Sequence, residues 1–218
     1  MNSVAKAGIA LGVLGGASGL GYVAIQQFTT TNDIASKLAK ENYQLLNNSS
    51  SDWTQILASY KEVIKTKTEL KFGDFDGTTP TTDTEKELQR LCNEATKLDL
   101  SKDTNNTTYN KAKKWCTKPK PLTSVLKDKG YRMLKTDAQG DHESDLWDTK
   151  LESYNTSTAN ASKKFSGLDL LTQNVLKKDE ATRNKLRERC RNLENKKHYE
   201  KEFEDKLDQA ILWCSTDN

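Results

Sequence analysis

The sequence has few of the residues from which large cores and most acid–base sites are built. Of its 218 residues, 34% are hydrophobic when glycine is left out of the count, against ~45–50% apolar residues in typical soluble domains. Only two histidines are present, and no GxxxxGK[ST], GxSxG or HExxH motif occurs. These motifs mark phosphate-binding loops, serine hydrolases and zinc proteases. The sequence therefore predicts no catalytic residue and no cofactor.

Metal-binding patterns are equally scarce. His142 lies in "DHESD" (Asp141–Asp145), which has metal-ligand residue types, but its setting in a polar insertion favours a solvated acidic loop. "DFDG" (Asp74–Gly77) lacks the third acidic position and the closing glutamate of a calcium loop, so it predicts a turn. No CxxC pair is present, and zinc sites commonly carry one. The sequence thus predicts no metal site.

No single sign of charge dominates, because 34 basic and 31 acidic residues leave a net charge of +3. Nucleic-acid-binding domains usually carry a stronger basic excess, so no nucleic-acid partner is predicted. Arg183, Arg187 and Arg191 stand four apart and would share one helical face. Such a face would suit phosphate, sialic acid or an acidic partner. The glutamates interspersed among these arginines favour the alternative of an ordinary solvated face.

Charge is missing altogether between Lys6 and Asp33. Ala7–Ile25 would form a helix of about 28 Å, close to the ~30 Å hydrocarbon core of a bilayer. Gly8, Gly12, Gly15 and Gly19 form one stripe with two GxxxG steps, which predicts close helix packing and a homo-oligomer formed through the anchor. We therefore expect a transmembrane helix in contact with the lipid bilayer, the alternative being a cleaved signal peptide.

After this segment the sequence repeats itself. The landmarks are Leu38, Tyr43, Leu45 and Leu46 with Leu126, Tyr131, Met133 and Leu134; Trp53–Tyr60 with Trp147–Tyr154; Leu88–Cys92 with Leu186–Cys190; and Ala112, Trp115 and Cys116 with Ala210, Trp213 and Cys214. Displacements grow from 88 to 98 residues only across polar loops, where insertions are tolerated. We predict an anchor at 1–30 and repeat units at 31–118 and 119–218.

Both units have helical periodicity. Trp53, Ile56, Leu57, Tyr60 and Ile64 follow the i, i+3, i+4, i+7, i+11 pattern, and no alternating run suggests a sheet. The predicted fold class is all-α: an N-terminal transmembrane helix followed by two tandem copies of a small disulfide-stapled helical unit.

Four cysteines, Cys92, Cys116, Cys190 and Cys214, allow three disulfide pairings. The spacing of 24 residues recurs in both units, and a unit that folds by itself must contain its own bond. We therefore predict Cys92–Cys116 and Cys190–Cys214. Stable disulfides belong outside the cytosol, which would place the C-terminal region outside the cell. Four buried free thiols in a cytosolic protein are the alternative.

Short motifs carry a family resemblance. Lys129-Gly130-Tyr131 followed by Leu134, Trp147 followed by Ser153-Tyr154, and the Trp-Cys pairs ending at Cys116 and Cys214 resemble the paralogous families of uncharacterised proteins of haemotropic mycoplasmas. The resemblance covers most of the chain and implies a surface or membrane-associated protein involved in host interaction or antigenic diversity. The first unit departs from the glycine motif, reading Glu41-Asn42-Tyr43.

The expected function follows from these patterns. We expect a single-pass protein of the cell membrane, with a non-catalytic extracellular module that binds a host or other extracellular protein, or an acidic ligand. A secreted binding protein with a cleaved signal peptide is the alternative, and an enzyme of unrecognised type is a third hypothesis.

Overall fold

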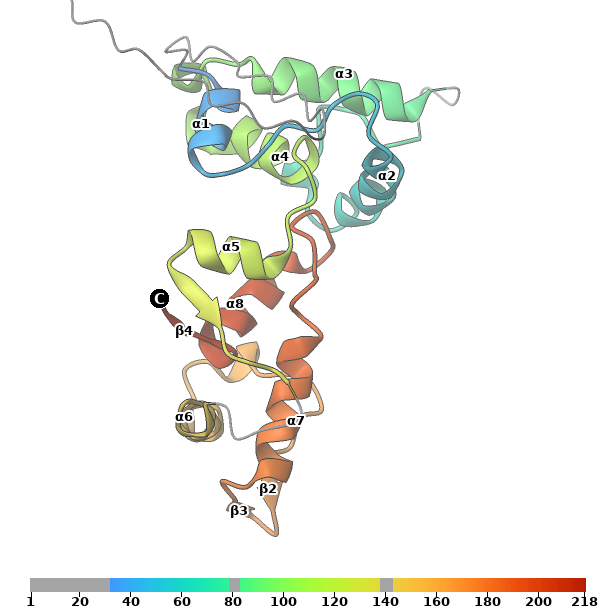
Figure 1. Ribbon diagram of the computed structural model, residues 1–218. Helices are drawn as coiled ribbons and strands as arrows, with labels where there is room; N and C mark the ends of the chain where they lie inside the picture. The colour runs from blue at the N-terminus through green and yellow to red at the C-terminus, as the bar shows by residue number, and fades with distance from the viewer. Residues whose placement is uncertain (1–31, 79–82, 138–142) are drawn as a thin grey trace, which may run out of the picture.

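The computed structural model describes residues 32–78, 83–137 and 143–218 as a two-lobed, predominantly helical molecule (Figure 1). Its helices are α1 (Ile34–Lys40), α2 (Asp52–Val63), α3 (Thr84–Thr96), α4 (Thr107–Trp115), α5 (Leu122–Asp128), α6 (Ser144–Thr156), α7 (Glu180–Arg191) and α8 (Phe203–Trp213). Short 3₁₀ turns are η1 (Thr68–Leu70), η2 (Leu100–Lys102), η3 (Thr104–Asn106) and η4 (Ala161–Lys163). The strands are β1 (Tyr131–Met133), β2 (Leu171–Thr172), β3 (Val175–Leu176) and β4 (Ser215–Asp217).

Each lobe has a hydrophobic cluster of its own. The first half (residues 32–118) carries α1–α4 around Trp53 and Trp115, and the second half (residues 119–218) carries α5–α8 around Trp147 and Trp213. One residue crosses over, because Tyr199 of the second half packs in the cluster of the first. All four tryptophans are almost completely buried in the two clusters. Because each buries a large apolar surface, they offset the small number of apolar residues in the chain.

The predicted helical stripes are the buried faces of real helices. In α2, Trp53, Ile56, Leu57, Tyr60 and Val63 are buried, while the rest of the helix faces solvent or is half-buried. That spacing places them on one side of a 3.6-residue turn. α3 shows the same pattern less fully, with Leu88, Cys92 and Ala95 buried. The expectation of a helix-rich chain is confirmed.

Matching contacts occur in the two halves. The ring of Tyr60 lies 5.2 Å from that of Trp115, edge to face, and the rings of Tyr154 and Trp213 lie 5.0 Å apart in the same way. Trp115 Nε1 donates to the carbonyl of Leu70 at 2.9 Å, and Trp213 Nε1 donates to that of Lys163 at 2.9 Å. In each half the indole thus fixes the turn that follows the tyrosine helix.

The predicted all-α class is wrong, because the described residues also form two small antiparallel sheets. β1 pairs with β4, placing Tyr131 opposite Asp217, and β2 pairs with β3 in a hairpin. Strands of two or three residues are too short for an alternating pattern to show in the sequence. β1 and β4 each follow a helix, α5 and α8, and pair the backbone groups of two extended segments.

The transmembrane part of the predicted class is also corrected. Within the described residues, no helix combines the length and the apolar character needed to cross a bilayer. The segment on which that prediction rested, residues 1–30 with Gly8, Gly12, Gly15 and Gly19, lies outside the described residues.

Candidate binding groove and the junction between the halves

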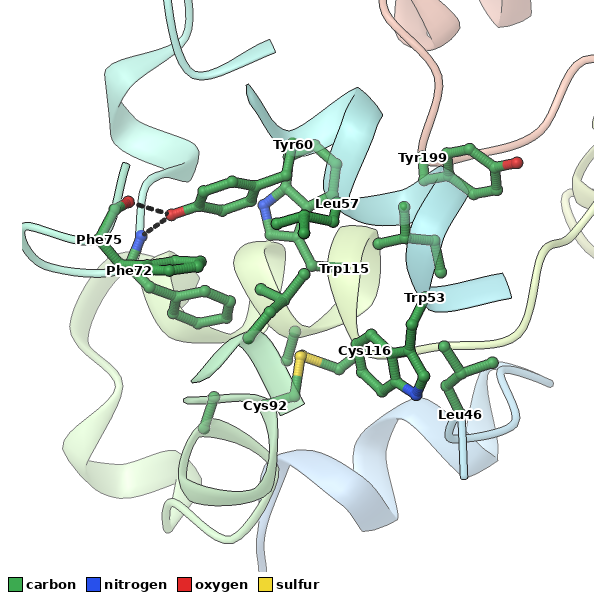
Figure 2. Packing of buried hydrophobic residues seen from close by; sticks show 14 of the residues in the cluster. Leu46, Trp53, Leu57, Tyr60, Phe72, Phe75, Cys92, Trp115, Cys116 and Tyr199 are labelled. Atoms are coloured by element: carbon green, nitrogen blue, oxygen red, sulfur yellow. Dashed lines mark hydrogen bonds between the residues drawn. A yellow bond between two sulfur atoms is a disulfide. The ribbon is translucent and has the colours of Figure 1, made fainter. Parts of the chain in front are cut away.

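The two predicted disulfides are confirmed. Cys92 of α3 is bonded to Cys116, which ends α4, and Cys190 of α7 is bonded to Cys214, which ends α8. All four side chains are buried, and the Cα atoms of the pairs are 5.3 and 5.5 Å apart. Each bond closes the same separation of 24 residues and joins two neighbouring helices of one half. Figure 2 shows the bond between Cys92 and Cys116.

A backbone contact beyond each bond repeats as well. Leu46 N donates to the carbonyl of Cys116 at 2.9 Å, and Leu134 N donates to that of Cys214 at 2.8 Å. The second cysteine of each pair therefore also fixes the extended segment that leads into the tryptophan helix. Each disulfide holds three pieces of its half together.

The three arginines of the predicted anion-binding face are engaged within the chain. Arg183 binds Asp148 of α6 through Nε at 2.8 Å and Nη2 at 2.9 Å, a bidentate pair that links α6 to α7. Arg191 donates to the backbone carbonyl of Thr136. These contacts direct two of the guanidinium groups to neighbouring segments of the second half.

Arg187 is the most buried of the three, with its side chain 1% exposed. Its guanidinium lies 5.6 Å from the centre of the Trp147 ring and donates to Glu180 Oε1 at 2.6 Å. A charge that is desolvated needs such partners, and here they come from the same half. The stripe that looked like a ligand surface in sequence is thus mainly an internal brace between α6 and α7.

The acidic segment at Asp74–Gly77 forms a local turn. Asp76 of "DFDG" accepts from Thr78 N at 2.8 Å and from its hydroxyl at 2.7 Å, a local turn of the predicted kind. His142 lies outside the described residues. Across the part of the chain that the structure describes, no group of three or more potential ligands is placed to hold a metal ion.

A groove of about 430 Å³ lies on the first half between the loop after η1 and the outer face of α3. Its apolar lining comes from Phe72, Phe75, Leu91, Ala95 and Leu98. A hollow of this size and character can receive apolar side chains.

The charged residues on the rim of the groove are mainly acidic: Asp74, Glu87 and Glu94 accompany one arginine, Arg90. Arg90 binds Glu87 at 2.6 Å and also pairs with Glu94, one turn to either side on α3. The side chains of Arg90 and Glu94 are more than half exposed and that of Glu87 is 25% exposed, so the network contributes little to stability. The groove therefore offers an apolar floor with a net acidic rim, and none of its lining residues is a histidine or cysteine.

The second half is polar at two of the positions that match the groove. A displacement of 98 residues puts Arg189 where the groove has Leu91 and Lys196 where it has Leu98, and both are exposed. Apolar side chains at the positions of Leu91 and Leu98 are thus not needed for a half of this kind to fold. This difference between the halves makes the groove the candidate binding surface of the first half.

The halves are joined by a buried polar contact around Lys114 of α4. Its side chain is 5% exposed and its ammonium donates to the carbonyl of His198 at 3.0 Å and to Glu204 Oε1 at 2.8 Å. Burial lowers the pKa of Lys114. Burial also acts to raise the pKa of Glu204, but the nearby ammonium groups outweigh it and leave the pKa of Glu204 below its usual value.

Tyr199 strengthens the same junction. Its ring packs in the first cluster (Figure 2), its hydroxyl donates to Gln55 Oε1 at 3.1 Å, and its carbonyl accepts from Ser59 Oγ at 2.7 Å. The sequence does not predict this role, because nothing local distinguishes a tyrosine that packs within its own half from one that packs in the other half.

Sequence reasoning also missed a repeated turn for which a signal exists. Lys71-Phe72-Gly-Asp-Phe75-Asp76 matches Lys164-Phe165-Ser-Gly-Leu168-Asp169, displaced by 93. Phe75 N donates to the carbonyl of Phe72 at 2.9 Å and Leu168 N to that of Phe165 at 3.2 Å, so both segments turn in the same way. Comparing the two loops residue by residue would have found the motif.

Comparison of the chain with protein-family models, with curated proteins and with solved structures finds no match.

Proposed function

We propose that residues 32–218 act outside the cytoplasm as a non-catalytic interaction module of a surface protein, built from two copies of one disulfide-stapled helical unit. The observation that carries this proposal is the pair of disulfides, each confined to one half and each closing 24 residues. Such bonds persist in oxidising surroundings and are rare in the cytosol.

Duplication of one unit is supported by the contacts that recur. Three contacts occur in both halves with similar geometry. They are the packing of a tyrosine ring against a tryptophan ring, the hydrogen bond from that indole to a carbonyl of the turn, and the hydrogen bond from the extended segment to the carbonyl of the second cysteine. A small unit with few apolar residues is stabilised by its cross-link, because it cannot bury much surface. On this proposal, doubling the unit lets one copy keep a polar face while the other carries an apolar groove.

Binding rather than catalysis is favoured by where the unusual groups lie. Lys114 and His198, whose pKa values are shifted by burial, sit in the junction and bond to backbone and side-chain groups there. The groove, in contrast, has an apolar floor. An active site would normally bring perturbed acids or bases into a cleft.

Protease shaving of intact cells that produce the protein tests the location. We expect peptides from 32–218 in the shaved fraction, and mapping without reduction should recover Cys92 joined to Cys116 and Cys190 joined to Cys214. Protection of these residues in intact cells together with four alkylatable thiols would contradict the proposal. Full-length protein in the medium rather than on cells would instead favour the secreted alternative.

A further inference from the structure

His198 occupies the point at which the linker and both halves meet. Its Nε2 lies 2.9 Å from Thr117 Oγ1, at the end of the first half. Its Nδ1 accepts a hydrogen bond from the backbone nitrogen of Lys120 at 3.1 Å, in the linker. The side chain is 4% exposed, and its ring meets Tyr43 of the first half edge to face at 5.7 Å. The imidazole of His198 thus connects the two halves through its hydrogen bonds and its ring packing.

The surrounding bonds define a single protonation state. A backbone N–H can only donate, so Nδ1 must present its lone pair to Lys120. Thr117 Oγ1 donates its own proton to the carbonyl of Lys113 at 2.8 Å, which leaves an oxygen lone pair for the proton on Nε2. The closed junction therefore fits neutral His198 with its proton on Nε2.

A second proton cannot be accepted without movement. It would bind Nδ1 and face the N–H of Lys120, donor against donor, in a place without solvent. Charged and titratable groups surround the imidazole on every packed segment. From the first half and the linker they are Lys113 and Lys114 of α4, Glu41 and Tyr43 of the loop after α1, and Lys120. From the second half they are Asp128 of α5, Glu204 of α8, and Lys196, Lys197, Tyr199 and Glu200 beside His198 in the sequence.

Cations dominate among the neighbours that act on His198 directly. Lys114, Lys120 and Lys113 all disfavour a positive imidazole. Three of the nearby carboxylates form ion pairs with these same lysines: Glu204 with Lys114, Asp128 with Lys120, and Glu41 with Lys113. No described carboxylate contacts the imidazole itself to balance a second proton.

We propose that the His198 junction is an acid-released joint: neutral His198 holds the two halves in one arrangement, and protonation of His198 frees them to move relative to each other while each stays folded. Each half keeps its own disulfide when the junction opens, and Tyr199 is the one residue of either hydrophobic cluster that belongs to the other half and would leave it. The linker Thr117-Lys-Pro-Lys-Pro121 would remain as an extended spacer between them.

The expected response to pH follows from proton linkage. Burial and the Lys114 ammonium lower the pKa of His198 from 6.5 to about 3 in the closed form. An exposed histidine in the open form has a pKa of ~6.5. The ratio of open to closed molecules is therefore constant above pH 6.5 and rises about tenfold per pH unit below it, reaching about 30-fold at pH 5.0.

Rotational correlation times from backbone ¹⁵N relaxation of the full chain test the proposal, because rigidly joined halves tumble as one body. At pH 7.5 we expect one correlation time for amides of both halves. At pH 5.0 we expect the correlation times of both halves to fall below the value at pH 7.5, with far-UV circular dichroism unchanged. His198→Gln, which cannot be protonated, should keep its correlation times equal between the two pH values, and His142→Gln should behave like the wild type.

Thr117→Val provides a second test if His198→Gln does not fold. Valine has the shape of threonine but removes the acceptor for Nε2–H, so this variant should open at a higher pH than the wild type. A correlation time in the wild type that is the same at pH 5.0 as at pH 7.5 would overturn the proposal. So would separation of the halves with the same pH profile in His198→Gln, or loss of far-UV signal in step with separation, since the last would be unfolding.

Discussion

The hydroxyl of Tyr60 lies 2.9 Å from the backbone nitrogen of Phe72 and accepts its hydrogen bond (Figure 2). The same hydroxyl donates to the carbonyl of Phe75 at 2.7 Å, so one side chain satisfies both ends of a buried turn. Tyr154 accepts from Phe165 N at 2.8 Å and donates to its carbonyl at 3.3 Å in the second half. In both halves a phenol replaces the backbone partners that this turn would otherwise lack.

Tyr60→Phe should therefore destabilise the protein by about 1–3 kcal/mol, because it leaves a buried N–H and a buried carbonyl without this partner. Tyr154→Phe is the matched variant and should cost less, since its donated bond is longer. Urea unfolding with the disulfides intact measures both. Wild-type stability in Tyr60→Phe would show that the turn finds other partners.

Removing one disulfide should weaken one half. The pair Cys92→Ala and Cys116→Ala should lower the free energy of unfolding by about 3–4 kcal/mol, the usual effect of freeing a loop of this length. Cys190→Ala with Cys214→Ala should have a similar effect on the second half. Hydrogen exchange should show the loss mainly in the half that carries the change. Equal loss of protection in both halves would mean that they unfold as one unit.

The arginine stripe should respond to mutation as a structural element. Arg187→Ala should destabilise the second half by about 2 kcal/mol, since it removes a packed guanidinium and leaves the space beside Trp147 unfilled. Arg189→Ala, an exposed neighbour on the same helix, is the control and should change stability by less than about 0.5 kcal/mol. Thermal unfolding compares them. If both variants are as stable as the wild type, Arg187 is not a brace.

Much of the fold could be read from the sequence because its signals are local or repeated. The stripe from Trp53 to Tyr60 needs only the helical period. The cysteine pairing needed one further step, since four cysteines leave three choices and the repeated spacing selects among them. The strands were not predictable in this way, because β1 and β4 depend on two segments that meet only after α8 has packed.

The roles of the candidate site residues were harder to predict from the sequence, because they too depend on segments that meet only in the folded protein. Arg187 is a brace only because folding brings Trp147 and Glu180 to it, and both lie on other turns or helices. The groove depends on the loop at Phe72 lying against α3. His198 has no local motif, and its role is visible only when Thr117 and Lys120 stand on either side of its ring.

Buried tyrosines predict a loss of stability in alkali. Burial raises the pKa of Tyr60 to about 12 and that of Tyr43 to about 12, from the usual 10. The folded state thus favours the protonated phenol, so each contribution is fully present below pH 10 and is lost as the pH rises from 10 to 12. At roughly 1.4 kcal/mol per pH unit, each tyrosine removes up to about 3 kcal/mol over that window.

A rapid jump to pH 11, followed by absorbance at 295 nm, separates tyrosines that ionise in the folded protein from those that must wait for unfolding. Tyr43 and Tyr60 should ionise in the slow phase, at the rate at which near-UV circular dichroism is lost. Tyr60→Phe should reduce the slow amplitude by one tyrosine and leave the fast amplitude unchanged. If the slow amplitude stays the same, Tyr60 ionises without unfolding, and its two hydrogen bonds to the turn at Phe72 do not hold it in the core.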